Sequence, residues 1–192
     1  MGHITQVKKL AAALGIVTTM SVLAVSPAFA GDTAPVSQGV TAGALTVSVT
    51  SDPSFSDVVY SHSSSRNSNA NMTMQVDDSR GGDVGWNVQI VSSGLVHTVD
   101  GTKTMGAAAV SVQSAGSPAL VAGQAIDSEV NGPLAGSGGA LDTARKVIFA
   151  NANYGNGTYD QILGLRVAVP ALQKAGTYVG TLTITEVSGP GV

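Results

Sequence analysis

The stretch Leu163-Gly-Leu-Arg-Val-Ala-Val169 alternates large apolar residues with small or polar ones. A period of two places successive side chains on opposite faces of a β-strand, so this stretch predicts a strand with one buried face. The same alternation recurs at 45–50, 72–76, 86–91 and 178–185, and shorter candidates lie at 57–60, 110–112 and 146–150. The chain is therefore expected to consist of short β-strands.

Stretches rich in Gly, Ser, Asn and Asp separate these candidates, at 61–71, 79–85, 132–139 and 151–158. Such punctuation is typical of turns, and only 119–130 and 139–146 could hold a helical turn. We expect an all-β fold, an antiparallel β-sandwich of roughly seven to nine short strands with little or no helix. A loose insertion is expected near 115–139, with an edge at 126–129.

The N-terminal residues 1–30 have the pattern of a secretory signal peptide. Lys8 and Lys9 precede an apolar stretch, and Ala28-Phe-Ala30 supplies the small-x-small cleavage pattern. The alternative, a membrane anchor, is disfavoured because the stretch is short and contains glycine, threonine and serine. Cleavage would leave residues 31–192 as a single domain, without a later apolar segment of membrane-spanning length. We therefore expect a secreted protein that does not associate with a membrane after processing.

Composition excludes several classes of protein. The 192 residues are 43% hydrophobic, 4% aromatic and 11% charged, they include no cysteine, and the formal net charge is −3. Without cysteine there is no disulfide scaffold, iron–sulfur cluster or thiol nucleophile. Without a basic cluster beyond the signal peptide there is no electrostatic footprint for nucleic acid.

Candidate catalytic groups are few. No Gly-x-Ser-x-Gly elbow is present, and His62 and His97 are the histidines that remain after processing. Carboxylates cluster at 77–83 and 127–129, where they are more typical of turns than of an acid–base pair. The loop at 77–83 has oxygen ligands for calcium but lacks the EF-hand spacing, and no zinc-ligand set is present. We expect no enzyme activity, no cofactor and no metal.

Three blocks of sequence occur in a distinctive order. They are Gly43-Ala-Leu-Thr-Val-Ser-Val with Pro53-Ser-Phe55, then Val76-Asp-Asp-Ser-Arg80-Gly81-x-x-x-Gly85-Trp86-x-Val88, then Leu165-x-Val-x-Val169-Pro170 with Ala175-Gly-Thr-Tyr178-x-Gly-Thr-Leu-Thr-Ile184. This order resembles the WxL family of bacterial cell-surface proteins, from about Gly43 to Glu186. The resemblance implies a β-sandwich and non-covalent attachment of an exported protein to the peptidoglycan of Gram-positive cells, without catalysis.

The chain departs from the family pattern at two places. Val88 stands where the first motif has leucine, which keeps an aliphatic side chain. Ile184 and Glu186 stand where the second motif has tryptophan and leucine. The second signature aromatic is therefore missing, and whether this loss affects wall binding is open at the level of sequence.

Four residues are candidates for ligand binding: Asp78, Arg80, Trp86 and Tyr178. Each has a structural alternative. Trp86 is in phase with the buried face of its strand and could fill the core rather than stack on a glycan. Arg80 could clamp the glycine turn through a nearby carboxylate rather than face a ligand, and the Tyr178 hydroxyl could tie a loop to the sandwich.

Three classes of function follow from these observations. The first is a secreted, wall-associated protein that binds peptidoglycan or another wall glycan, with other surface proteins as further partners. The alternative is a self-assembling structural subunit of an extracellular fibre or surface layer, because exposed edge strands can pair between copies. A secreted enzyme is the third class, and the catalytic inventory disfavours it.

Overall fold

The computed structural model describes residues 35–189. The chain divides into two units, residues 1–39 and residues 40–192. Of the first unit the structure describes 35–39, which are exposed and have no regular secondary structure. The predicted signal peptide and its cleavage site lie outside the described residues.

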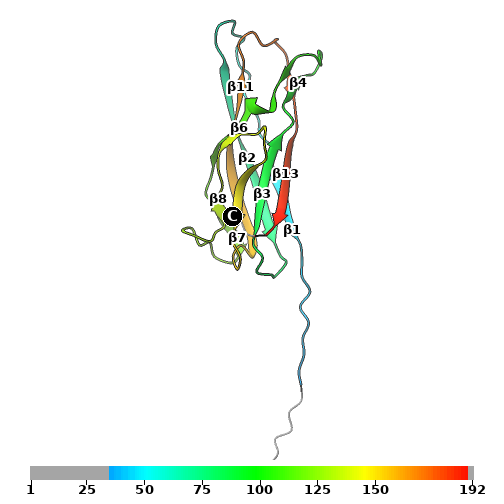
Figure 1. Cartoon of the computed structure of the whole chain (residues 1–192), viewed down its shortest axis with the longest axis vertical. Coiled ribbons are helices and arrows are strands. Elements are labelled where there is room, and N and C mark those ends of the chain that lie inside the picture. The colour runs from blue at the N-terminus through cyan, green and yellow to red at the C-terminus, as the bar shows by residue number, and fades with distance from the viewer. Residues whose placement is uncertain (1–34, 190–192) are drawn as a thin grey trace, which may run out of the picture. The chain divides into compact units, whose positions relative to one another are not determined.

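The second unit is built from β-strands (Figure 1). Within the described residues, eight strands have five residues or more: β1 (Leu45–Ser51), β2 (Arg66–Asp78), β3 (Trp86–Ser92), β6 (Val110–Ala115), β7 (Ala119–Gly123), β10 (Arg145–Ala150), β11 (Gly157–Val169) and β13 (Leu182–Ser188). Five shorter strands join them: β4 (Leu95–His97), β5 (Thr104–Met105), β8 (Leu134–Ala135), β9 (Gly139–Ala140) and β12 (Tyr178–Val179). One 3-10 turn, η1 (Ala107–Ala109), is the helical element of the described part.

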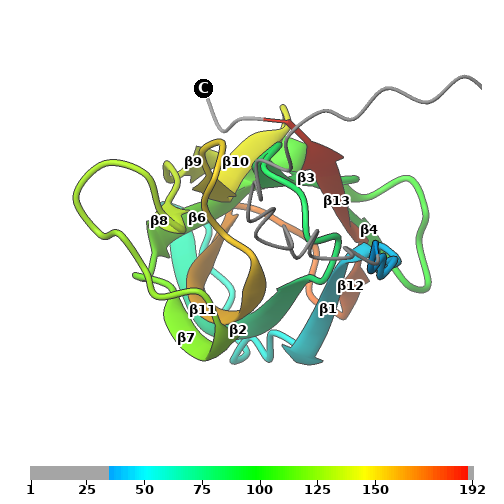
Figure 2. The same cartoon turned by 90° about the horizontal axis from the view of Figure 1, so that it is seen from below.

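Two antiparallel sheets face each other across the core (Figure 2). The larger has the order β1-β2-β11-β6-β9, with β7 also paired to β11, and the smaller has the order β13-β3-β10-β8. A third, small sheet has the order β12-β4-β5. The expected all-β antiparallel sandwich is confirmed. No described helix is long and apolar enough to cross a membrane.

The two thirteen-residue strands β2 and β11 form the centre of the larger sheet and pair along their whole length, from Asp78 opposite Gly157 to Arg66 opposite Val169. Their buried positions alternate with more exposed ones, as the sequence pattern predicts. The fully buried side chains come from both sheets and are mostly aliphatic or methionine, with Trp86 and Tyr159 the large aromatics among them. An aromatic-poor sequence thus still closes a continuous core.

One local expectation is wrong. Residues 57–60 form no strand and lie in the loop between β1 and β2, where the Ser68 hydroxyl donates to Ser56 O at 2.7 Å. The segments 119–130 and 139–146, which the sequence left open to a helical turn, hold none. Instead β7, β8 and β9 lie within 115–140, each paired to a longer strand. Pairing with a neighbour, which local sequence does not reveal, decides these conformations.

Candidate functional site

Trp86 begins β3 and points into the core. Its side chain is fully buried, and its indole Nε1 donates to Gly155 O at 3.0 Å. The ring packs at a tilt of 43° against Tyr159, with 6.3 Å between ring centroids. The indole therefore has the apolar surroundings and the single acceptor that a buried tryptophan needs. No face of the ring is left for a glycan to stack on.

Two glycines make room for this arrangement. Gly85, which precedes Trp86, has a φ of 71°, and a Cβ there would lie 2.6 Å from Ala150 O. Gly155 has a φ of 83°, and a Cβ there would lie 2.6 Å from Trp86 Nε1. Only glycine meets both the positive φ and the close approach. The Gly-Trp pair of the motif is thus a packing requirement.

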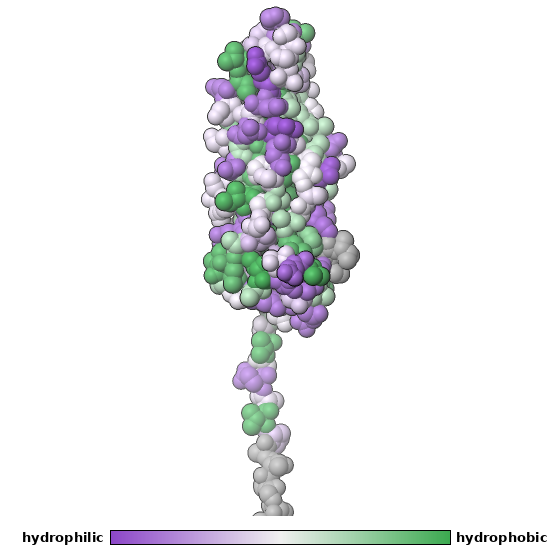
Figure 3. All heavy atoms as spheres, turned by 90° about the vertical axis from the view of Figure 1, so that its left-hand side faces the viewer, coloured by the Kyte–Doolittle hydropathy of each residue, from purple (hydrophilic) through white to green (hydrophobic). Residues whose placement is uncertain are grey.

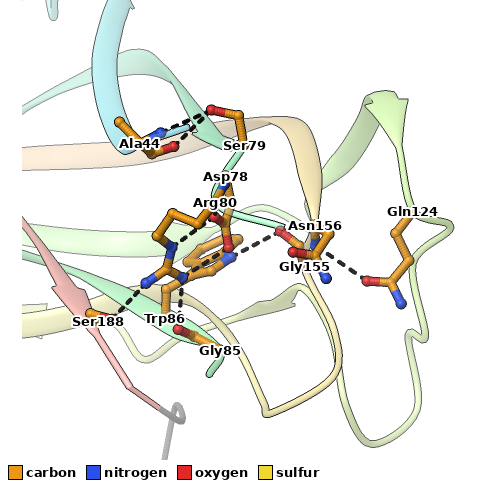
Figure 4. Close-up of polar contacts among 10 residues, drawn as sticks. All are labelled: Ala44, Asp78, Ser79, Arg80, Gly85, Trp86, Gln124, Gly155, Asn156 and Ser188. Carbon is orange, nitrogen blue, oxygen red and sulfur yellow. Dashed lines mark hydrogen bonds and ion pairs between the residues drawn. The ribbon is translucent and has the colours of Figure 1, made fainter. Parts of the chain in front are cut away.

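Arg80 clamps the turn that joins β2 to β3 (Figure 4). Its Nε and Nη2 donate to the two carboxylate oxygens of Asp78, each at 2.8 Å, so the pair is bidentate. Nη2 also donates to Gly85 O at 3.0 Å, and Nη1 donates to Ser188 Oγ at 2.5 Å. One guanidinium therefore joins the end of β2, the glycine turn and the end of β13.

The charges of this clamp are largely withdrawn from solvent. The side chain of Asp78 is 1% exposed and that of Arg80 is 21% exposed. The hydrogen bonds from Arg80 to Asp78 raise the pKa of the guanidinium above its ordinary value, so it stays charged. Asp77, another carboxylate of this loop, accepts a hydrogen bond at Oδ1 from Thr158 Oγ1 at 2.6 Å. The clamp is a structural ion pair.

Gln124 holds the loop that supplies the acceptor for Trp86. Its Oε1 accepts from the Asn156 N–H at 3.2 Å, and its Nε2 donates to Asn153 O at 3.0 Å. Its own backbone carbonyl accepts from the Tyr159 hydroxyl at 2.7 Å. Burial raises the pKa of the Tyr159 phenol, and the negative charge of Asp78 adds to the increase. The motif block is therefore embedded in a network of fixed structural contacts.

Tyr178 lies at the other end of the sandwich, in β12. Its hydroxyl donates to Lys174 O and accepts from Gln173 Nε2, both at 2.8 Å. Its ring meets His97 edge-on, with 5.0 Å between centroids. Because Asp78 and Arg66 end a strand of thirteen residues, the two ends of the sandwich are roughly 40 Å apart. The four predicted residues therefore do not form one site.

His97 has a structural role at this end. It is buried, its Nδ1 accepts from the N–H groups of Val99 and Asp100 at 3.1 and 3.0 Å, and its Nε2 lies 3.1 Å from Ala175 O. With Nδ1 accepting, Nε2 carries the proton and donates to that carbonyl. Both ring nitrogens are therefore occupied.

A surface cavity of about 520 Å³ opens beside Tyr178. Its lining combines aromatic rings with polar groups, among them Phe55, Tyr60, Arg66, Gln173, Lys174 and Tyr178. Tyr60 and Arg66 are exposed, and no described residue forms an ion pair with Arg66. Lys174 pairs with Asp100 at 2.8 Å and thereby lowers the pKa of that carboxyl. Rings, an amide and a free guanidinium can contact a sugar carrying a carboxylate.

Of the four predicted residues, Tyr178 lines this cavity, and Asp78, Arg80 and Trp86 do not. Sequence reasoning did not single out the other lining residues as ligand contacts, because they come from β2, β4, β5, β11 and the loops before β2 and β12. It also missed Gly155, which is 69 residues from Trp86. Phe55, Pro170 and Ala175 stand in the blocks that carry the family resemblance, whereas no local pattern marks Gly155 or the exposed Tyr60 and Arg66.

In a comparison with known protein families, the chain matches one family model. The family model described as "WxL domain surface cell wall-binding" matches residues 25–185, which include the Asp78–Arg80 pair, Trp86 and the residues that line the cavity. No curated protein matches the chain.

Proposed function

This chain belongs to the WxL family of surface cell wall-binding domains, and we propose that it is an exported, non-catalytic protein that binds peptidoglycan without a covalent bond. The observation that carries the proposal is the extent of the family match, residues 25–185, since it spans nearly the whole described fold. The peptidoglycan ligand and the absence of catalysis are the parts that go beyond the family description.

The cavity beside Tyr178 is the proposed contact with the wall. Glycan strands present flat apolar sugar faces edged by hydroxyl groups, and the peptides attached to them carry carboxylates. Tyr60 offers an exposed ring for stacking, Gln173 offers an amide, and Arg66 offers a guanidinium free to pair with a carboxylate. Tyr178 positions Gln173 through its hydroxyl and lines the cavity itself.

Trp86, Asp78 and Arg80 contribute to wall binding through the fold in this proposal. Their side chains are occupied by Gly155, by each other and by Ser188, so a ligand would have to break these contacts to reach them. The loss of the second motif tryptophan at Ile184 then leaves binding intact, because Ile184 packs against the core from β13.

Non-catalytic binding to peptidoglycan is tested with two preparations of sacculi, one native and one stripped by acid of its covalently attached polymers. We expect the protein to pellet equally with both, and no soluble fragment to be released on prolonged incubation. Retention on native sacculi but not on stripped sacculi would identify the attached polymers, rather than peptidoglycan, as the ligand. Release of muropeptides would contradict the non-catalytic role.

The alternative function is a self-assembling structural subunit. One observation favours it: β7 is a sheet edge whose five residues are all exposed. Protein that fails to pellet with sacculi and forms polymers alone would put this alternative first.

A further inference from the structure

Strand β7, Ala119-Leu-Val-Ala-Gly123, is an edge of the larger sheet. Among the described strands it pairs with β11 alone, and all five of its residues are exposed. It carries no charged residue, although edge strands in soluble proteins are usually blocked by charges or proline. Its one irregularity is at Val121, which the register with β11 skips. Its outer backbone groups are available to another strand.

One apolar side chain on the core side of this edge is partly exposed. Leu120 lies directly opposite Tyr159, which is fully buried, and residues directly opposite in an antiparallel pair face the same side of the sheet. Leu120 therefore faces the core side, yet it is 44% exposed, and Val121 is 54% exposed. Figure 1 places β7 toward the lower left, and Figure 3, which views that side, shows apolar residues gathered toward the lower end. One more strand would cover them.

Residues 36–42, Val-Ser-Gln-Gly-Val-Thr-Ala, have the pattern of a strand but no partner. Val36, Val40 and Ala42 fall on one face of an extended chain together with Gln38, and serine, glycine and threonine fall on the other. The segment has no regular secondary structure, and Val36 and Val40 are 95% and 94% exposed. The next residue, Gly43, donates from its N–H to Ser79 O at 3.0 Å, where β1 is about to begin.

We propose that residues 36–42 of one copy of this chain add as a strand along β7 of a second copy. Main-chain hydrogen bonds would complete the edge, and the valine face would cover Leu120. Donor and acceptor are different surfaces, so the contact is head-to-tail and repeats from copy to copy. The inference goes beyond wall binding and does not depend on it.

Sheet geometry favours a second copy over the chain's own β7. Leu45, Asp78, Gly157 and Gly123 form one row across β1, β2, β11 and β7. Three strand spacings separate the ends of this row, about 14 Å, which takes four or five extended residues to cross. Within one copy that crossing would use residues 40–44 and leave Val40 and Ala42 outside any pairing with β7.

The first test is sedimentation of the chain from Gly31, which keeps every described residue. We expect a concentration-dependent series of head-to-tail oligomers. A lysine at the donor, Val40→Lys, or at the acceptor, Val121→Lys, is expected to abolish the series. The matched control is Val59→Lys, at an 81% exposed valine of the opposite end, which should assemble like the parent. A parent that stays monomeric at millimolar concentration overturns the proposal.

The second test uses the absence of cysteine from the chain. A mixture of the Val40→Cys and Leu120→Cys proteins should form a mixed disulfide between copies on mild oxidation, whereas Val40→Cys mixed with Val99→Cys should not. The proposal is overturned if a Val40→Cys/Leu120→Cys double variant forms its disulfide only within one chain and not between copies. Sacculus pelleting of Val121→Lys should equal that of the parent, so a failure of assembly and a failure of wall binding are distinguishable.

Discussion

At the scale of single residues, Trp86 fills the core and fixes the loop behind it through one hydrogen bond. Trp86→Phe keeps an aromatic ring but leaves Gly155 O without its donor and removes part of the packing against Tyr159. We expect the free energy of unfolding to fall by about 2–4 kcal/mol. Urea denaturation measures the change. Tyr60→Phe, at an exposed aromatic, is the control and should shift it by no more than about 0.5 kcal/mol.

Removing one partner of the Asp78–Arg80 ion pair is expected to destabilise the fold more than its share of removing both. Arg80→Ala leaves a buried carboxylate without its cation and should cost about 3 kcal/mol of unfolding free energy. Removing both partners should cost less than the sum of the two single changes. A double-mutant cycle by urea denaturation checks this. Additive effects would show that the two side chains do not act as a pair.

Tyr159 predicts how stability changes in alkali. Burial and the charge of Asp78 raise its pKa in the folded state above that of the unfolded chain. The folded protein then binds the phenolic proton more tightly, so this contribution is present below the unfolded pKa of about 10 and is lost as pH rises through the folded pKa. Unfolding free energies from pH 8 to 11 should fall less steeply for Tyr159→Phe. Equal slopes would contradict the assignment to Tyr159.

For these residues the sequence predicts the kind of contact, such as burial or an ion pair, but not the distant residues that take part in it. The phase of Trp86 with Val88 and Ile90 indicates burial, and all three are fully buried. The nearness of Asp78 to Arg80 indicates a local ion pair, which forms. Gly155 and Ser188 are 69 and 108 residues from the side chains they contact, so no local pattern reveals them.

At the scale of strands, alternation identifies the long elements and fails for the short ones. β2 and β11 each have buried residues at every second position over most of their length, which is the signal the sequence carries. Strands β5, β8, β9 and β12 have two residues each, too few to show a period. They form because a neighbouring strand offers hydrogen-bond partners.

Gln161 on β11 joins the two sheets through the core. It is 1% exposed, and its Nε2 donates at 2.8 Å both to Gly116 O and to Val147 O, the latter on β10 of the opposite sheet. Gln161→Leu leaves Gly116 O without its side-chain donor, whereas Val147 O still accepts from the Gly136 N–H at 2.7 Å. The expected loss is about 1 kcal/mol of unfolding free energy. Thermal or urea unfolding measures it, with the exposed Gln113→Leu as control. An unchanged stability would mean that Gly116 O finds another donor.

At the scale of the whole domain, the Asp78–Arg80 clamp and the surface cavity lie at opposite ends of the sandwich. The motif block that identifies the family forms the clamped end, whereas the cavity with exposed Tyr60 and Arg66 lies beyond the other end of β2. Sequence reasoning therefore recognises the family from residues that build the fold. The cavity escapes it as a site, because its lining comes from strands and loops that only the folded chain brings together.

The most direct test of the account is a binding isotherm of the chain from Gly31 with purified peptidoglycan sacculi. We expect saturable pelleting by the parent, and loss of pelleting by a folded Tyr60→Ala/Arg66→Gln variant that changes only the cavity. Trp86→Phe, if folded by circular dichroism, should still pellet. Absence of pelleting by the parent, or loss of pelleting by folded Trp86→Phe with the cavity variant unaffected, would contradict the account.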